Sequence, residues 1–375
     1  MSSERVNLSA ADVARLAGNH SEEVRAETAA KVARAFEAGL SDSERDLAAD
    51  IFRALLGDAA QRVRAALSDS LKSSPDVPRD VALTLAADVA EVATPMLKWS
   101  EVLTDEDLLA VVRDKSSAHQ VAIAQRDIVS AGLADALAET HDENVVATLI
   151  GNDGADIAET TLQKVLDEYA DSDAVKAPMA HRRTLPLTVS ERLVTLVSDQ
   201  LREHLVTHHA LPGDLATDLV LESRERATVS LTGDGAGRMD VAELVRHLAR
   251  NQRLTPTITL RAVCMGDMAF FECALAELCG IPVVNAAQLI NDEGPRGLKA
   301  VCKRAGIPKE MFKFIVAAVE VAKDTADDGL PGGRGRFVAR MIERVLTKLE
   351  DEMADADTEY LIAKLSGETT AQSAA

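Results

Sequence analysis

Apolar residues recur every three to four positions along most of the chain, in short runs that end at glycine, proline or a polar capping residue. Two such runs meet at each copy of Gly-Ile-Pro, at residues 280–282 and 306–308. Glycine ends a helix readily because it accepts positive φ, and proline starts the next helix because its missing N–H needs no partner there. The pattern predicts an all-α protein, a stack of helix pairs with a further helical domain after it.

Two glycine-rich segments divide this pattern and predict the domain boundaries. The first, at 230–238, separates a repeat region over 1–230 from a C-terminal helical domain over 235–325. The second predicts a flexible linker at 326–336, followed by a terminal amphipathic helix at 337–366. A helix that is apolar on one side must bury that side against its own body or a partner. The apolar residues at helix spacing in this terminal segment are Val338, Ile342, Val345, Leu349 and Met353.

A short cadence recurs in the first part of the chain: an acidic residue, then Val-Arg, then alanine. Val24-Arg25 and Val63-Arg64 stand 39 residues apart (63 − 24), close to the period of HEAT and armadillo units. The cadence resembles the second helix of HEAT-like repeats. Together with LRAVCMGDMAFFECALAELCGIP at 260–282, it also makes the chain similar to an uncharacterised helical-repeat family found mainly in alphaproteobacteria, domain of unknown function 2336. The resemblance implies an irregular HEAT/armadillo-like superhelical stack of α-helix pairs and no particular activity.

Composition and charge narrow the function classes. The formal net charge is −20, which opposes binding to nucleic acid and to an anionic membrane surface. The first residues lack a signal-peptide core, and no run approaches the ~18 apolar residues of a membrane span, so we expect a cytoplasmic protein without membrane insertion. Trp99, which follows Pro95, is predicted to be a packing wedge between two helices.

Few residue patterns indicate chemistry. The chain has no phosphate-binding loop, nucleophile elbow or zinc-protease motif, so we predict no enzyme activity, no cofactor and no metal. All four cysteines fall within 264–302 at spacings that match no zinc pattern and are predicted to be small buried hydrophobes. Thr188 and Glu191 have the spacing of a capping box at the start of a long helix.

A group of arginines follows the first glycine-rich segment. Its members are Arg246, Arg250, Arg253 and Arg261. Guanidinium groups bind phosphates in a bidentate manner, but they also form structural ion pairs with acidic residues of neighbouring helices. The leading interpretation is therefore a non-enzymatic adaptor or scaffold, with possible homodimerisation through the terminal helix. The alternative is a sensor that binds a small anionic ligand, such as a signalling nucleotide, at these arginines.

Overall fold

The computed structural model describes residues 21–37, 40, 42–209, 213–232, 237–292, 294–327 and 333–349. Every regular element in these residues is a helix, so the predicted all-α class is confirmed. Contacts divide the chain into two compact units, Met1–Thr184 (unit 1) and Leu185–Ala375 (unit 2). This division differs from the predicted boundary near residue 230, because two long helices after Thr184 pack with the C-terminal helices.

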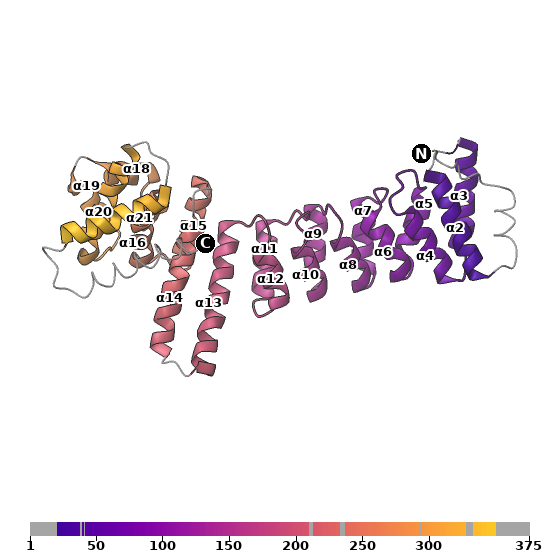
Figure 1. The fold of residues 1–375 in the computed structure, drawn as a ribbon, viewed down its shortest axis with the longest axis horizontal. Helices are drawn as coiled ribbons and strands as arrows, with labels where there is room; N and C mark the ends of the chain where they lie inside the picture. Colours follow the sequence, from indigo (N-terminus) through magenta and orange to yellow (C-terminus); the bar gives the residue numbers. More distant parts are fainter. Residues whose placement is uncertain are drawn as a thin grey trace. The chain divides into compact units, whose positions relative to one another are not determined.

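The described part of unit 1 consists of short helices in two layers (Figure 1). The helices are α2 (Glu22–Glu37), α3 (Asp42–Leu56), α4 (Gln61–Leu71), α5 (Arg79–Ala86), α6 (Ala90–Trp99), α7 (Asp105–Asp114), α8 (Ser117–Ala124), α9 (Ala131–Ala138), α10 (Glu143–Ile150), α11 (Glu159–Glu168) and α12 (Asp173–Ala180). The even-numbered helices pack side by side in chain order and form one layer. The odd-numbered helices form the other, with α3 against α4, α5 against α6, α7 against α8 and α9 against α10.

Several short helices of unit 1 start at a polar side chain that caps them, and the short helices bury one face. Thr104 forms a capping box with Asp107 at the start of α7, and the Ser130 hydroxyl caps α9. Along α4, Val63 and Leu67 are fully buried and lie four residues apart, so they share one face of the helix. Short helices such as these form because packing of the buried stripe, rather than the helix itself, supplies most of their stability.

Unit 2 begins with two long helices that pack against each other and continues with shorter ones. Its described helices are α13 (Leu187–His209), α14 (Gly213–Ser230), α15 (Arg238–Arg250), α16 (Pro256–Cys264), α17 (Met268–Cys279), α18 (Val283–Asn291), α19 (Pro295–Arg304), α20 (Lys309–Asp327) and α21 (Gly333–Leu349). Helix α17 lies between two apolar clusters, because its adjacent residues Phe270 and Phe271 belong to different ones. Gly280 and Gly306 adopt φ of 63° and 75° at the ends of helices α17 and α19, which confirms the predicted Gly-Ile-Pro corners.

The terminal helix α21 packs against its own unit. Phe337 and Met341 are buried in the cluster around α17, α19 and α20, and the ring of Phe337 lies against the bare Cα of Gly266. Val338 is buried as well, and Ile342 packs against the same cluster. The predicted linker at 326–336 is helical at both ends, since α20 extends to Asp327 and α21 begins at Gly333.

Parts of the terminal prediction lie outside the described structure. These are the side chains of Val345 and Leu349, and Met353 altogether. In the described ranges, no single helix has the length and apolar composition to cross a membrane, although α17 and α18 pass that test together as a pair bent by 113°.

Candidate functional site

The four predicted ligand-binding arginines separate into two pairs. Arg246 and Arg250 are exposed on α15, on the side opposite its buried residues. Arg253 and Arg261 are mostly buried, and each faces a carboxylate of α13 or α14. The structure therefore does not bring the four guanidinium groups together as one anion site. It supports structural ion pairing for the second pair.

Arg253 belongs to a buried polar cluster around Glu191 of α13. The Glu191 side chain is fully buried and forms an ion pair with the Arg253 guanidinium. The Nε2 atom of His247 lies 3.5 Å from the other carboxylate oxygen, and the Thr195 hydroxyl donates to Glu191 at 3.2 Å. Burial lowers the pKa of Arg253, and the charge of Glu191 partly offsets that effect. Glu191 thus ties α13 to α15, and the predicted capping box is wrong because Thr188 lies inside α13 rather than before it.

Arg261 lies beside a second buried carboxylate, that of Glu225 on α14. The hydroxyls of Thr255 and Thr257 donate to one oxygen of Glu225 at 2.8 and 2.6 Å, and Arg261 lies 3.9 Å from the other. Thr255 also caps α16, so this cluster joins the start of α16 to α14. Both clusters hold helices together, which accounts for their arginines without a ligand.

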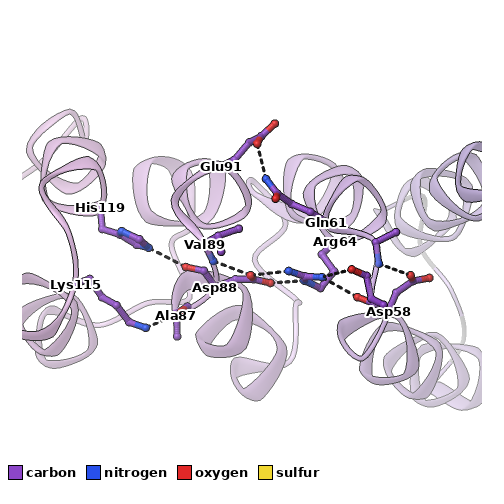
Figure 2. Close-up of polar contacts among 11 residues, drawn as sticks. Asp58, Gln61, Arg64, Ala87, Asp88, Val89, Glu91, Lys115 and His119 are labelled. Atoms are coloured by element: carbon purple, nitrogen blue, oxygen red, sulfur yellow. Dashed lines mark hydrogen bonds and ion pairs between the residues drawn. The ribbon is translucent and has the colours of Figure 1, made fainter.

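A ladder of charged side chains runs between neighbouring even-numbered helices of unit 1 (Figure 2). Arg64 of α4 pairs with Asp88, which precedes α6, through contacts of 2.5 and 2.9 Å, and donates to the carbonyl of Asp58 at 2.7 Å. Arg25 of α2 pairs with the Asp58 carboxylate at 2.7 and 3.1 Å. The hydrogen bonds from these arginines hold the pKa values of Asp58 and Asp88 below the usual range of aspartate.

The next helix continues the ladder through backbone atoms (Figure 2). The Nε2 atom of His119 lies 2.9 Å from the carbonyl oxygen of Asp88, and Lys115 donates to the carbonyl of Ala87 at 2.7 Å. The ladder therefore fixes the spacing from α2 to α8. The Val-Arg cadence of the sequence contains two arginines of this ladder, Arg25 and Arg64.

At the opposite ends of these helices, three loops are tied together by side chains that donate to backbone carbonyls. We call residues 97–103, 124–130 and 150–156 the loop edge. The guanidinium of Arg126 donates to the carbonyls of Leu97 and Ser100 at 2.6 and 2.8 Å. The Asn152 amide donates to the carbonyls of Ala124 and Arg126 at 2.9 and 2.7 Å. Each tie crosses from one loop to the loop before it.

Arg182 closes the loop edge at its far end. Its guanidinium donates to the carbonyls of Ile150, Asn152 and Ala155 at 2.8, 2.9 and 3.0 Å. Burial lowers the pKa of Arg182, as it does for Arg126. Carbonyls at helix C-termini carry partial negative charge, so they can hold a buried guanidinium without a carboxylate in direct contact.

A close backbone approach completes the loop edge. Val129 and Ala155 form a parallel bridge, in which the Val129 N–H donates to the carbonyl of Gly154 at 3.2 Å. A Cβ atom on Gly154 would lie 1.9 Å from the carbonyl oxygen of Asp127, so only glycine fits at this position. The backbone of the loop edge is thus fixed by several independent contacts.

Two large apolar side chains are exposed on this fixed backbone. Ile128 is 80% exposed and Trp99 is 42% exposed, so the prediction that Trp99 is a packing wedge is wrong. Lys98 places its Nζ atom 4.9 Å from the centre of the Trp99 ring and bonds to Gln125 at 3.2 Å. The other exposed charges of these loops are mostly carboxylates. They are Glu101, Asp127 and Asp153 within the loop edge, and Asp156 at its end.

The loop edge escaped prediction because its ties join side chains to backbone carbonyls. Such bonds leave no sequence motif, because a backbone carbonyl can belong to a residue of any type. No recognisable pattern surrounds Arg126, Asn152 or Arg182 in the sequence. A signal was present in Ile128, an apolar residue that lies in a polar loop, QRDIVS, between two helical runs.

The cysteines behave as predicted, since Cys264, Cys273, Cys279 and Cys302 are free and buried. Burial raises the pKa values of Cys264 and Cys302 to about 12, which keeps both thiols protonated at neutral pH. Among the residues that the structure describes, no three His, Cys, Asp or Glu side chains are grouped so that they could hold a metal ion.

The model of a family described as "Uncharacterised protein conserved in bacteria (DUF2336)" matches residues 92–354. This region runs from α6 to beyond α21 and leaves out the helices that carry the Val-Arg cadence. No curated protein and no solved structure matches the chain.

Proposed function

The chain belongs to the bacterial family DUF2336, whose description names no activity, and from its structure we propose a non-enzymatic adaptor that binds another protein through the loop edge of unit 1. The observation that carries this proposal is the exposure of Trp99 and Ile128 on a backbone that several hydrogen bonds hold in place. Tryptophan is among the residues that contribute most to protein interfaces when a partner covers them.

A fixed backbone favours binding because less conformational freedom is lost on association. Arg126, Asn152 and Arg182 order the loop edge before any partner arrives. Ordering flexible loops at an interface costs binding free energy, so a preformed edge keeps more of the energy of apolar contact. The same apolar side chains on a mobile loop would bind more weakly.

Charge indicates the chemistry of the partner. Around Trp99 and Ile128 the exposed carboxylates outnumber the cations, and Arg183, which lies near the edge, is 3.1 Å from Asp153. A complementary surface would combine apolar side chains with lysine or arginine at its rim. We therefore expect the partner to present a basic segment with at least one large apolar residue.

The layered helices of unit 1 support a HEAT-like scaffold as the body of this adaptor. Pairs of helices packed in two layers, with an Asp–Arg ladder at one end, make a repeating frame that displays its loops in a row. Surfaces of this kind suit protein recognition, and a role in bacterial signalling is the setting in which we would first look for the partner.

Photo-crosslinking tests the proposal directly. A photoreactive aromatic amino acid replaces Ile128 in cells, and a protein that crosslinks there is identified by mass spectrometry. The same replacement at Val89, which is 49% exposed in unit 1, is the matched control. A partner of the loop edge crosslinks from position 128 and not from position 89. Equal crosslinking from both positions, or none from position 128, would contradict the proposal.

Affinity measurements with the crosslinked partner then test the residues. Losing an interface residue of this kind costs about 2 kcal/mol, or about a 30-fold rise in Kd. We expect that rise for Trp99→Ala and for Ile128→Ser, and an unchanged Kd for Val89→Ser. Because the rim is acidic, salt should weaken binding further, mainly by slowing association.

A further inference from the structure

Exposed basic side chains gather in unit 2 where α19 joins α20. From residue 296 to residue 313 the sequence has six lysines and arginines and a single acidic residue, Glu310. In a protein of net charge −20, this segment therefore has a formal charge of +5 (6 − 1). We call its exposed cations the basic corner. They are Arg296, Lys299, Lys303 and Arg304 of α19 and Lys309 and Lys313 of α20.

The basic corner differs from the buried arginines of unit 2 in having no carboxylate beside it. Arg253 and Arg261 face Glu191 and Glu225, whereas among the residues that the structure describes no carboxylate pairs with a member of the basic corner. Cations in the last turn of α19 are favoured by the negative end of the helix dipole, but that accounts for two of the six. Like charges one turn apart on a helix repel each other, so an anionic partner would stabilise this surface.

Helix α21 directs the chain toward the basic corner. Arg344 of α21 pairs with Asp324 of α20 at 2.6 Å and lies 4.0 Å from Glu320. Residues 328–332 alone separate the two helices, and a connection of that length spans at most about 18 Å. It cannot return the chain to the start of α20, which is about 28 Å away, so the two helices run antiparallel. The end of α21 therefore points toward the start of α20, where Lys309 and Lys313 lie.

The sequence that follows α21 has the opposite charge. Residues 350–359, EDEMADADTE, contain six carboxylates and no lysine or arginine, and they lie outside the described structure. Along α20, Lys309 is about 22 Å from Asp324, and the last five residues of α21 cover about 7 Å of that distance. The remaining distance of about 15 Å is within reach of a ten-residue segment, which spans about 33 Å when extended.

We propose that the basic corner is a docking site for an acidic segment, and that residues 350–359 of the same chain occupy it. The tether gives the segment an effective concentration of about millimolar, which favours it over a second copy or a free anion. Each contact between exposed charges is weak and screened by salt, so the docking depends on several carboxylates together. While docked, the segment keeps other polyanions from the basic corner. This inference concerns unit 2 and is independent of the loop edge, which lies in unit 1.

Carbodiimide coupling in the full chain tests the docking first. The reagent activates a carboxylate, and a lysine amine in contact with it then forms an amide bond. Lys303, Lys309 and Lys313 should couple to residues 350–359 at least about ten times faster than Lys323 does, and about 1 M salt should remove the difference. Lys323 is the matched control, because it is exposed on α20 beside Asp324 and is also within reach of the segment. In a mixture of isotope-labelled and unlabelled protein, each crosslink should join two peptides of the same chain.

Binding of heparin, a soluble polyanion, tests whether the segment covers the basic corner. The full-length variant Glu350→Gln/Asp351→Asn/Glu352→Gln/Asp355→Asn should bind heparin at least about ten times more tightly than the wild type. Adding Lys303→Gln/Lys309→Gln to that variant should remove the gain. The control variant neutralises four exposed carboxylates of unit 1 and should gain less than about threefold: Glu106→Gln/Asp114→Asn/Glu139→Gln/Asp171→Asn.

Three results would overturn the proposal. The first is coupling of Lys323 to the segment as fast as that of Lys303, Lys309 and Lys313. The second is a set of crosslinks that join labelled to unlabelled chains, which would make a second copy the partner. The third is an equal gain in heparin affinity for the two neutralised variants, which would reflect net charge rather than release of the basic corner.

Discussion

The two units hold their helices together by different means. In unit 1, polar side chains at the helix ends join each helix to the next: Arg64 to Asp88 at one end, Arg126 and Asn152 to backbone carbonyls at the other. In unit 2, helices surround α17 in an apolar core, and the charged ties lie inside, at Glu191 and Glu225. Hydrogen bonds and ion pairs that repeat at helix ends favour a regular stack with exposed loops, whereas buried ion pairs favour a compact unit.

The largest expected effect is in unit 2, at Glu191. Replacing it with leucine leaves the buried guanidinium of Arg253 without its carboxylate, and breaking a buried pair in this way costs about 3–5 kcal/mol. Hydrogen exchange of the α17 amides reports the stability of unit 2. Trp99, the one tryptophan of the chain, lies in unit 1, so its fluorescence should report little change.

The double variant Glu191→Leu/Arg253→Leu is the control for this prediction. Removing both charges eliminates the uncompensated guanidinium, so the double variant should be more stable than the Glu191→Leu single variant. If the double variant were the less stable of the two, Arg253 would be stabilising unit 2 by some contact other than its pair with Glu191.

The second largest effect is expected in unit 1, at Gly154. An alanine there would place its Cβ atom against the Asp127 carbonyl, so the two loops must separate, at a cost of about 3 kcal/mol. Urea unfolding followed by Trp99 fluorescence measures the loss. Gly132→Ala in α9 is the matched control: no atom lies within 4 Å of its new methyl group, and we expect a gain of about 0.5–1 kcal/mol. Equal effects at both glycines would show that the loop edge is not held closed.

These two regions also show how far the sequence could be interpreted. Helix class, the Gly-Ile-Pro corners and the buried cysteines follow from local spacing, because each depends on residues within a turn or two. The spacing of Val24-Arg25 and Val63-Arg64 even marked the ladder, whose partners Asp58 and Asp88 lie 33 and 24 residues further on. Local spacing does not show which distant residue a charged side chain contacts in the folded protein.

The failures share that cause. Glu191 has the spacing of a capping box, yet the residue that it meets, Arg253, is distant in the chain. Trp99 is the kind of residue that usually fills a core, and only the placement of the loops leaves it exposed. Fold class is therefore predictable from local pattern, and surface function depends on contacts that pattern does not contain.

A smaller effect is expected for the ladder at Arg64, and it should depend on pH. Arg64→Leu removes the partner of the mostly buried Asp88 carboxylate and should cost unit 1 about 2 kcal/mol at neutral pH. The folded pKa of Asp88 is lowered, so its stabilising contribution is present above the unfolded pKa of about 3.9 and is lost as pH falls through the folded pKa. The difference between wild type and variant should therefore narrow below about pH 4.

Arg62→Leu is the matched control for the ladder, since Arg62 is on the same helix but 63% exposed, with Glu23 at 3.4 Å. Exposed pairs contribute about 0–1 kcal/mol, and this variant should show little change in unfolding by Trp99 fluorescence. A gap between Arg64→Leu and wild type that stayed constant down to pH 3 would mean that the charge of Asp88 does not stabilise unit 1.

The smallest effect is expected at the exposed arginines of α15, and it separates the two functions that the sequence allowed. Among the residues that the structure describes, no carboxylate pairs with Arg246 or Arg250, and Arg246 donates to the carbonyl of Ala242 at 3.3 Å. Arg246→Ala and Arg250→Ala should each change stability by less than about 0.5 kcal/mol.

An anion sensor would need more than these two groups, because Arg253 and Arg261 are held by Glu191 and Glu225. Thermal unfolding of the wild type with a panel of nucleotides should thus show no shift. A shift that disappears in the Arg246→Ala/Arg250→Ala variant would instead support ligand sensing by unit 2.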